Sequence, residues 1–146
     1  MKGFLIAVAL AISCSGIVVG YSGKAAQSLS SRPETTPAYG LLVVRKAKVE
    51  SELAFLSARL SYKHPLIKSK RFELGAIGDE MESLRAVKMP RLTRLSSAVG
   101  NLILDKVELE VKLNDLMVNL YPRHPDVTRQ RLELVALERE IENVLR

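Results

Sequence analysis

Two histidines are the residues of this chain best suited to do chemistry, because imidazole can bind a metal ion or transfer a proton near neutral pH. One stands in the triplet Lys63-His64-Pro65 and the other in Arg123-His124-Pro125. Neither has a second His, Cys or carboxylate at a spacing typical of metal ligands. The sequence also contains no serine nucleophile elbow, no glycine-rich phosphate loop and no zinc-protease motif. We therefore interpret both histidines as structural turn residues and expect no catalytic site, metal or cofactor.

The sequence around the two His-Pro pairs repeats itself at a spacing of 60 residues. Residues 40–85 align with residues 100–145 without gaps and share 15 identities in 46 positions. The identities fall on apolar positions, on the His-Pro pair and on several charged residues. This internal repeat indicates one supersecondary unit that is used twice.

Apolar residues on both sides of each His-Pro pair recur at alternating steps of three and four, which is the heptad spacing of a coiled coil. Before the pairs, the heptad positions are Tyr39, Leu42, Lys46, Val49, Leu53, Leu56 and Leu60 in the first unit, and Leu92, Leu95, Val99, Leu102, Lys106, Leu109, Leu113, Leu116 and Leu120 in the second. After the pairs they are Ile67, Lys70, Leu74, Ile77, Met81 and Leu84, and then Val127, Gln130, Leu134, Leu137, Ile141 and Val144. Proline fits only the first turn of a helix. We therefore expect a new helix after each pair, with His64 and His124 as its N-cap.

The predicted fold is all-α, with two tandem antiparallel helical hairpins that form a coiled coil or an elongated four-helix bundle. A helix that continues through each turn with a kink is the alternative. Residues 38–86 are assigned to the first hairpin and residues 91–146 to the second, with a helix expected from about residue 91, because Pro90 interrupts the chain between them. The polar residues 24–37 are interpreted as a flexible linker.

One lysine interrupts the apolar heptad that precedes each His-Pro pair. If the chain reverses at each turn, Lys46 lies beside Glu80 and Glu82, and Lys106 lies beside Glu140 and Glu142. Such a lysine can fix the register or the number of helices. Alternatively, its stem lies along the apolar residues while its ammonium reaches a nearby glutamate.

The N-terminal residues 1–23 have the layout of a signal peptide or a membrane anchor. A lysine at position 2 is followed by an apolar stretch and small residues, and no further charge occurs before residue 24. Three fates are open: cleavage near Gly20 to Gly23 or after Ala26, retention of residues 4–21 as an anchor, or lipidation of Cys14 in a lipobox-like sequence. All three predict an extracytoplasmic location in a bacterial periplasm, either tethered to the membrane or secreted.

The net charge of +6 is concentrated near the first His-Pro pair. The basic residues there are Arg59, Lys63, Lys68, Lys70 and Arg71. They form either a solvated helix face or a site for an anionic glycan or lipid headgroup. Nucleic acid is not an expected partner, because the N-terminus predicts export.

The sequence around both turns resembles the bacterial polysaccharide co-polymerases, also called the chain-length determinant family. The resemblance is carried by residues 56–65 and 116–127, where leucines run into Tyr, Lys or Arg, His and Pro before a heptad helix. It covers roughly residues 40–146. It implies long periplasmic coiled-coil helices joined by this turn, oligomerisation in the inner membrane, and an influence on the length or export of surface polysaccharide. The chain departs from the family in having one apolar segment, no strand-like run and no phosphate loop of a kinase domain.

These features together predict a non-enzymatic envelope protein that acts by assembly, with surface polysaccharide biosynthesis as the more specific expectation. Its partners would be further copies of the chain or other coiled-coil envelope proteins, and anionic polysaccharide as a further option. The expected association seam consists of Leu53, Leu56, Leu60, Leu113, Leu116 and Leu120, and the expected partner contacts are Lys63, His64, Pro65, Arg123, His124 and Pro125. The alternative is a binding module that uses the basic residues named above.

Overall fold

The computed structural model describes residues 32–88 and 90–146. In these residues the chain forms helices and no strand, so the predicted all-α class is confirmed. The elements in order are η1 (Pro33–Thr35), α2 (Pro37–Ser57), α3 (Pro65–Arg85), η2 (Arg91–Arg94), α4 (Ser97–Asn119) and α5 (Pro125–Leu145). The expected signal peptide or anchor, Cys14 and most of the expected linker lie outside the described residues. No helix of the described part is long and apolar enough to cross a membrane.

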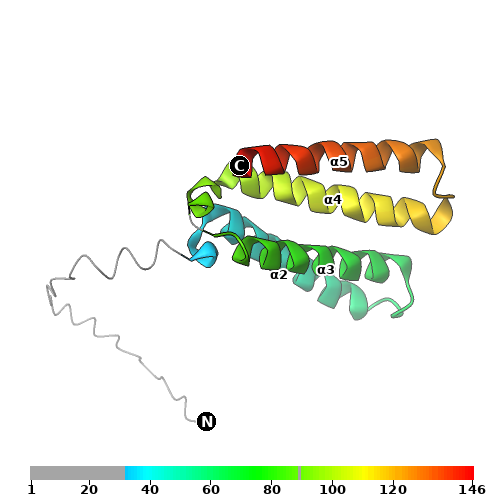
Figure 1. Ribbon diagram of the computed structural model, residues 1–146. Coiled ribbons are helices and arrows are strands. Elements are labelled where there is room, and N and C mark those ends of the chain that lie inside the picture. Colours follow the sequence, from blue (N-terminus) through cyan, green and yellow to red (C-terminus); the bar gives the residue numbers. More distant parts are fainter. Residues whose placement is uncertain (1–31, 89) are drawn as a thin grey trace, which may run out of the picture.

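The four α-helices form two antiparallel hairpins stacked on each other, α2 with α3 and α4 with α5 (Figure 1). Both hairpin turns lie at one end of the bundle, and the start of α2 and the C-terminus lie at the other. We call the half of the bundle that contains the two turns the distal half, and the half that contains the start of α2 and the C-terminus the proximal half (Figure 1). The chain reverses at each turn, so the alternative of a kinked continuous helix is excluded.

The histidines cap the two helices that follow the turns. Nδ1 of His64 accepts a hydrogen bond from the backbone N–H of Leu66 at 3.2 Å, and Nδ1 of His124 accepts one from Asp126 at 3.2 Å. A proline occupies the first position of each helix, where a missing N–H does no harm. The predicted N-caps are therefore confirmed in both repeats.

The third α-helix begins later than expected. Residues 91–94 form a single 3-10 turn, and Leu95, with φ −74° and ψ 62°, leaves the helical conformation. Ser96 then caps α4, since its hydroxyl accepts a hydrogen bond from the N–H of Val99 at 3.4 Å. The serine thus supplies the acceptor that a new helix start requires, and α4 begins at the residue after it.

One glycine allows the hairpins to approach closely. A Cβ atom on Gly100 would lie 2.8 Å from Cα of Ala38 and 2.9 Å from Cδ1 of Leu41. The N–H of Ala38 also donates a hydrogen bond to the carbonyl of Leu95 at 3.3 Å. Gly40, the repeat counterpart of Gly100, faces open space. Only the second glycine of the repeat is therefore required by packing.

The hydrophobic core fills the proximal half. Its buried residues are Ala38, Tyr39, Leu42 and Val49 of α2, Ala76, Ile77, Met81 and Leu84 of α3, Leu92 and Leu95 around η2, and Val99, Ile103 and Val107 of α4. Helix α4 packs on α2, α3 and α5, whereas α5 packs mainly on α4 and η2. From α5 the core receives only the partly buried Ile141 and Leu145. Helix α5 is therefore an edge helix (Figure 1).

The deepest residues of α4 differ from most of those that the heptad predicted. Val99, Ile103 and Val107 are buried, at steps of four, while Leu102 and Leu109 are only half-buried. The reason is that α4 has neighbours on two sides and needs two apolar faces. The predicted heptad positions supply one of these faces. The other face contains Ile103 and Val107, which directly follow the heptad positions Leu102 and Lys106.

Candidate functional site

The distal half exposes apolar side chains on both hairpins. They are Phe55, Tyr62, Leu66, Phe72, Met117, Val118, Tyr121 and Leu132, with Val118 exposed by 76% and Tyr121 by 87%. The expected association seam also lies here, and all six of its leucines are half-buried. Beyond the core, only Ile67 and Val127 among the apolar residues of this half are buried. The two hairpins therefore leave apolar surface at this end that their own packing does not cover.

The distal half is also strongly basic, as the sequence predicted. Residues 55–72 contain five Lys and Arg and no carboxylate, and residues 116–132 contain three Arg and one Asp. The guanidinium of Arg59 stacks on Phe55 at 4.1 Å and that of Arg71 on Tyr62 at 4.0 Å, distances measured to the ring centroids. Such cation–π contacts hold the charges beside exposed rings. The end of the bundle thus combines apolar and cationic groups.

One of the five predicted basic residues is already paired. The ammonium of Lys70 lies 2.7 Å from Glu52 and 2.9 Å from Glu73. Burial alone would lower the pKa of Lys70, but its hydrogen bonds to these two carboxylates raise the pKa overall. The charge of Lys70 is therefore neutralised within the first hairpin, and the structure brings together the other four at the distal end.

The turn residues that were expected to contact a partner are accessible to different degrees. Lys63, Pro65, Arg123 and Pro125 are exposed, whereas His64 and His124 are half-buried and engaged in capping. Between the start of α3 and the end of α4, a depression of about 270 Å³ is lined by Leu66 and Val118 among others. Across it the hydroxyl of Ser69 donates a hydrogen bond to the carboxylate of Asp115 at 3.0 Å.

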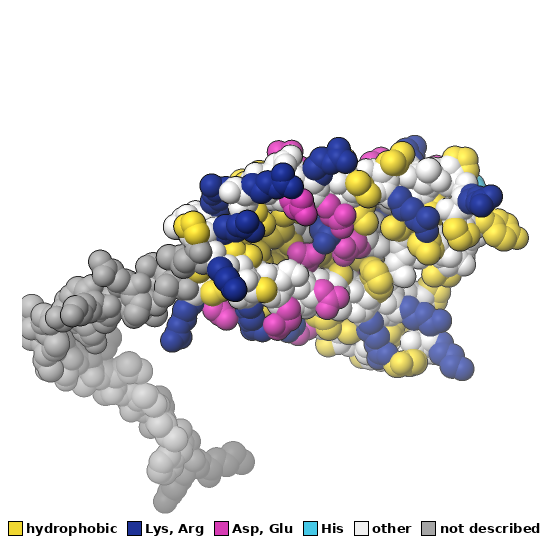
Figure 2. Space-filling model, viewed as in Figure 1, with side chains coloured by type: hydrophobic (Ala, Val, Ile, Leu, Met, Phe, Trp, Pro, Cys, Tyr) yellow, Lys and Arg dark blue, Asp and Glu magenta, His cyan; other side chains and the backbone are white. Residues whose placement is uncertain are grey.

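A second candidate surface lies in the proximal half, between α3, α4 and α5. We call it the proximal groove. It has a volume of about 400 Å³, and its apolar lining consists of Leu84, Val87, Ile103, Ile141 and Leu145. Its charged lining consists of Glu80, Glu138, Glu142 and Lys106. Figure 2 shows hydrophobic side chains inside a hollow between the two hairpins, with acidic side chains beside it.

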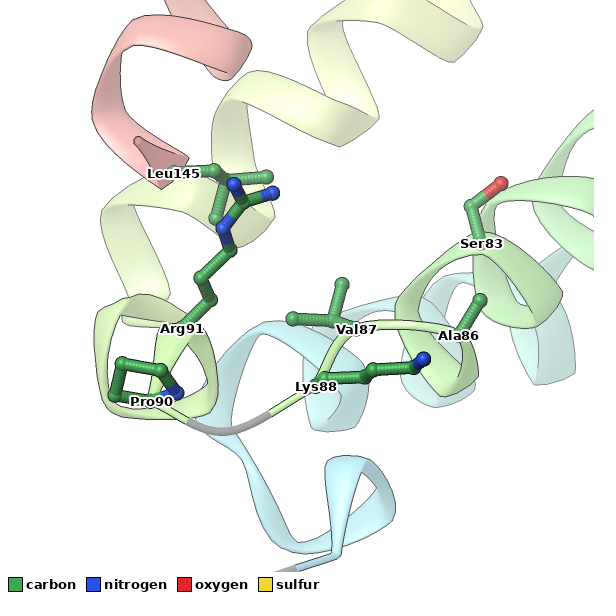
Figure 3. Close-up of a pocket in the computed structure, with 7 residues that line it drawn as sticks. All are labelled: Ser83, Ala86, Val87, Lys88, Pro90, Arg91 and Leu145. Carbon is green, nitrogen blue, oxygen red and sulfur yellow. The ribbon is translucent and has the colours of Figure 1, made fainter.

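The proximal groove continues toward the linker between the hairpins. There a hollow of about 350 Å³ shares Ser83, Val87 and Leu145 with it and is also lined by Lys88 and Arg91. In Figure 3 the side chain of Arg91 extends from η2 toward Leu145 of α5, while Val87 lies between them and α3. The groove therefore has an acidic middle and a basic end.

Lys106 links the three helices around the proximal groove. Its ammonium lies 2.6 Å from Glu80 on α3, 3.5 Å from Glu110 on α4 and 3.7 Å from Glu138 on α5. Burial opposes the charge of Lys106, but the hydrogen bond to Glu80 and the two further carboxylates raise its pKa overall. Burial also raises the pKa of Glu110.

The expected glutamate partners of the two lysines were wrong. Lys106 pairs with Glu80 and Glu138 and not with Glu140 or Glu142, and Lys46 contacts Glu50 of its own helix at 3.9 Å. The physical reason is the position of α4 between the hairpins. A lysine on α4 can reach α3 as well as α5, and the ammonium of Lys106 lies between Glu80 of α3 and Glu138 of α5.

The sequence interpretation missed a buried carboxylate. Glu73 is 4% exposed, and its carboxylate lies 2.6 Å from a guanidinium nitrogen of Arg45 on α2 and 2.9 Å from Lys70. Lys70 three residues earlier was a signal for an ion pair on one helix face. The burial was not foreseeable, because it depends on Arg45 from the neighbouring helix.

The described residues contain no group of three or more His, Cys, Asp and Glu placed to hold a metal ion. What the geometry offers is two surfaces for contact, the distal end and the proximal groove. Comparisons of the chain with protein-family models, with curated proteins and with solved structures found no match.

Proposed function

We propose that this protein is a non-enzymatic component of the bacterial cell envelope that acts by assembly, with itself or with other coiled-coil proteins. The observation that carries the proposal is the distal half, where large apolar side chains are exposed on both hairpins, in the turns and on the adjoining helix ends. Exposed apolar residues that cluster at one place are typical of protein interaction sites. The association seam lies beside them and is only half-buried within the single chain.

The extracytoplasmic location in this proposal rests on the apolar N-terminal sequence. The role in polysaccharide chain-length control or export rests on the resemblance of the two turns to polysaccharide co-polymerases. Deletion of the gene in the native host, followed by gel comparison of surface polysaccharide lengths, tests this role. An unchanged length distribution would remove polysaccharide from the proposal and leave assembly untouched.

Assembly itself is tested by sedimentation equilibrium of the full chain over a range of protein concentrations. Val118→Asp should weaken self-association, because it places a charge in the exposed apolar surface of the distal half. The matched control is Val44→Asp, since Val44 is 69% exposed on α2 and lies outside the distal half. A wild-type chain that stays monomeric throughout, alone and with envelope extract, would refute the proposal.

A second candidate function is supported by the charge of the distal half. Arg59, Lys63, Lys68 and Arg71 lie within a stretch that contains no carboxylate, and they would hold an anionic glycan or lipid headgroup by charge alone. The Debye length falls from ~10 Å at 0.1 M salt to ~3 Å at 1 M, so this binding should be lost at high salt. Retention of the protein on an anionic polysaccharide column at 1 M salt would contradict this mechanism.

A further inference from the structure

We propose that the α4–α5 turn of one copy, led by Tyr121 and Arg123, inserts into the proximal groove of a second copy. This inference rests on the proposed function and specifies its partner, which is the chain itself. The resulting contact is head-to-tail, because the turn lies in the distal half and the groove lies in the proximal half (Figure 1). Repetition of such a contact builds a filament or closes into a ring.

The inserting turn is apolar, cationic and stiff. Tyr121 is 87% exposed, and no cation stacks on its ring among the described residues, whereas the ring of Tyr62 in the other turn is covered by Arg71. Pro122 restricts the backbone beside it, and the capped start of α5 follows at once. A preformed turn loses little conformational entropy on binding, and a tyrosine can bury its ring while its hydroxyl finds a polar partner.

The proximal groove complements this turn in both size and charge. Its volume of about 400 Å³ falls in the range of roughly 300–1,000 Å³ typical of binding sites. The apolar lining would receive the ring of Tyr121. Three carboxylates against one ammonium line the groove, so the guanidinium of Arg123 would meet a net negative charge. Glu138 lies 3.7 Å from Lys106, its nearest partner, and is half-exposed, which leaves it accessible to an incoming arginine.

The location of the groove also explains why the chain itself does not fill it. Helix α5 packs on α4 and η2, so its side toward α3 keeps Ile141 and Leu145 partly open. Across the groove from these two residues lies α3, which lines the groove and does not pack closely on α5. A turn from another copy would cover apolar surface that the intramolecular packing leaves accessible.

Cysteine cross-linking of full-length chains tests the contact directly, in a background with Cys14→Ser. Chains with Tyr121→Cys are mixed with chains that carry Ser83→Cys, since Ser83 is an exposed residue of the groove lining. Mild oxidation should yield a covalent dimer of the two different chains. The matched control is Tyr62→Cys, which places an exposed thiol on the other turn, since Tyr62 is 68% exposed. Equal cross-linking from both turns, or none from residue 121, would overturn the inference.

Charge reversal provides a second test that does not depend on oxidation. Arg123→Glu should lower the self-association constant at least tenfold, and Glu138→Arg in the same chain should restore most of the loss. Circular dichroism melts confirm that each variant folds. If the wild-type chain associates but neither test responds, the head-to-tail contact is wrong and the proposed assembly function stands. If the chain is monomeric both alone and with envelope extract and no cross-link forms, both proposals fall.

Discussion

The two hairpins have related sequences and different surroundings. Helix α3 buries six residues, Ile67, Glu73, Ala76, Ile77, Met81 and Leu84, whereas its repeat counterpart α5 buries only Val127 and Gln130. Helix α4 covers α3 from the second hairpin, but no described helix covers α5 in the same way. The heptad pattern therefore decides which residues pair inside a hairpin. The neighbours of the hairpin decide how deeply those residues are buried.

The two hairpins should differ most in stability when equivalent apolar side chains are shortened to alanine. Ile77 is 0% exposed and Leu137, its counterpart, is half-buried. Ile77→Ala should lower the free energy of unfolding by about 2–5 kcal/mol, because it leaves a cavity in a packed core. Leu137→Ala should lower it by about 1 kcal/mol, since water can reach the vacated space. Urea unfolding of both variants measures this, and equal losses would show that α5 is as well covered as α3.

A smaller difference in stability is expected for the glutamate that both repeats share, Glu73 and Glu133. Glu73→Gln removes the charge that Arg45 and Lys70 share, and should lower the free energy of unfolding by about 1–3 kcal/mol. Glu133, its counterpart, is exposed. Glu133→Gln should change stability by less than about 0.5 kcal/mol, as surface substitutions usually do. Thermal unfolding at low ionic strength compares the two, and a large effect at position 133 would contradict the assigned exposure.

Leucine substitutions at the polar heptad position that follows each turn should change the free energy of unfolding in opposite directions in the two hairpins. Gln130 is 8% exposed, and its Nε2 has no hydrogen-bond partner among the described residues. Gln130→Leu should therefore stabilise the protein by about 1 kcal/mol, because an unpaired buried amide is unfavourable. Lys70→Leu should destabilise it, since Glu52 and Glu73 lose their shared ammonium. Chemical denaturation gives both values, and loss of stability in Gln130→Leu would indicate that the amide is paired.

The smallest effects concern two glutamates whose pKa values shift in opposite directions. Burial raises the pKa of Glu110, so its ionisation lowers stability as the pH rises through the folded-state pKa. A hydrogen bond from Lys70 lowers the pKa of Glu52, so Glu52 contributes stability above its unfolded-state pKa and loses it in acid.

Glu110→Gln should therefore be more stable than the wild type at pH 7, and Glu52→Gln should be less stable. As the pH falls from 7 to about 3, the difference for Glu110→Gln should shrink first, because the pKa of Glu110 is raised, and the difference for Glu52→Gln should shrink later, because the pKa of Glu52 is lowered. Melting temperatures across this pH range measure the change. If both variants changed stability in the same direction at pH 7, the two carboxylates would have similar environments.

Several features could be predicted because their causes are local. Pro65 and Pro125 can stand only in a first helical turn, so the positions of α3 and α5 follow from them. The histidine before each proline is placed to cap the new helix, and the distance from its Nδ1 to the backbone nitrogen that donates to it is 3.2 Å in both repeats. The basic character of the distal end also followed from composition alone.

Other features could not be predicted, because they depend on which hairpin faces lie against each other. The second apolar face of α4, with Ile103 and Val107, became meaningful only once α2 and α3 were seen to pack on it. The position of Lys106 among carboxylates of three helices has the same origin.

The amino-acid order by itself determined that the chain is helical and that a histidine-capped helix begins at each His-Pro pair. These properties arise from backbone sterics and from hydrogen bonds between residues close in the chain. Only the tertiary structure decided that α4 is central, that Glu73 is buried and that the groove beside α5 stays open. Residues 60 positions apart in the repeat carry similar side chains, and burial depends on what the rest of the molecule places against them.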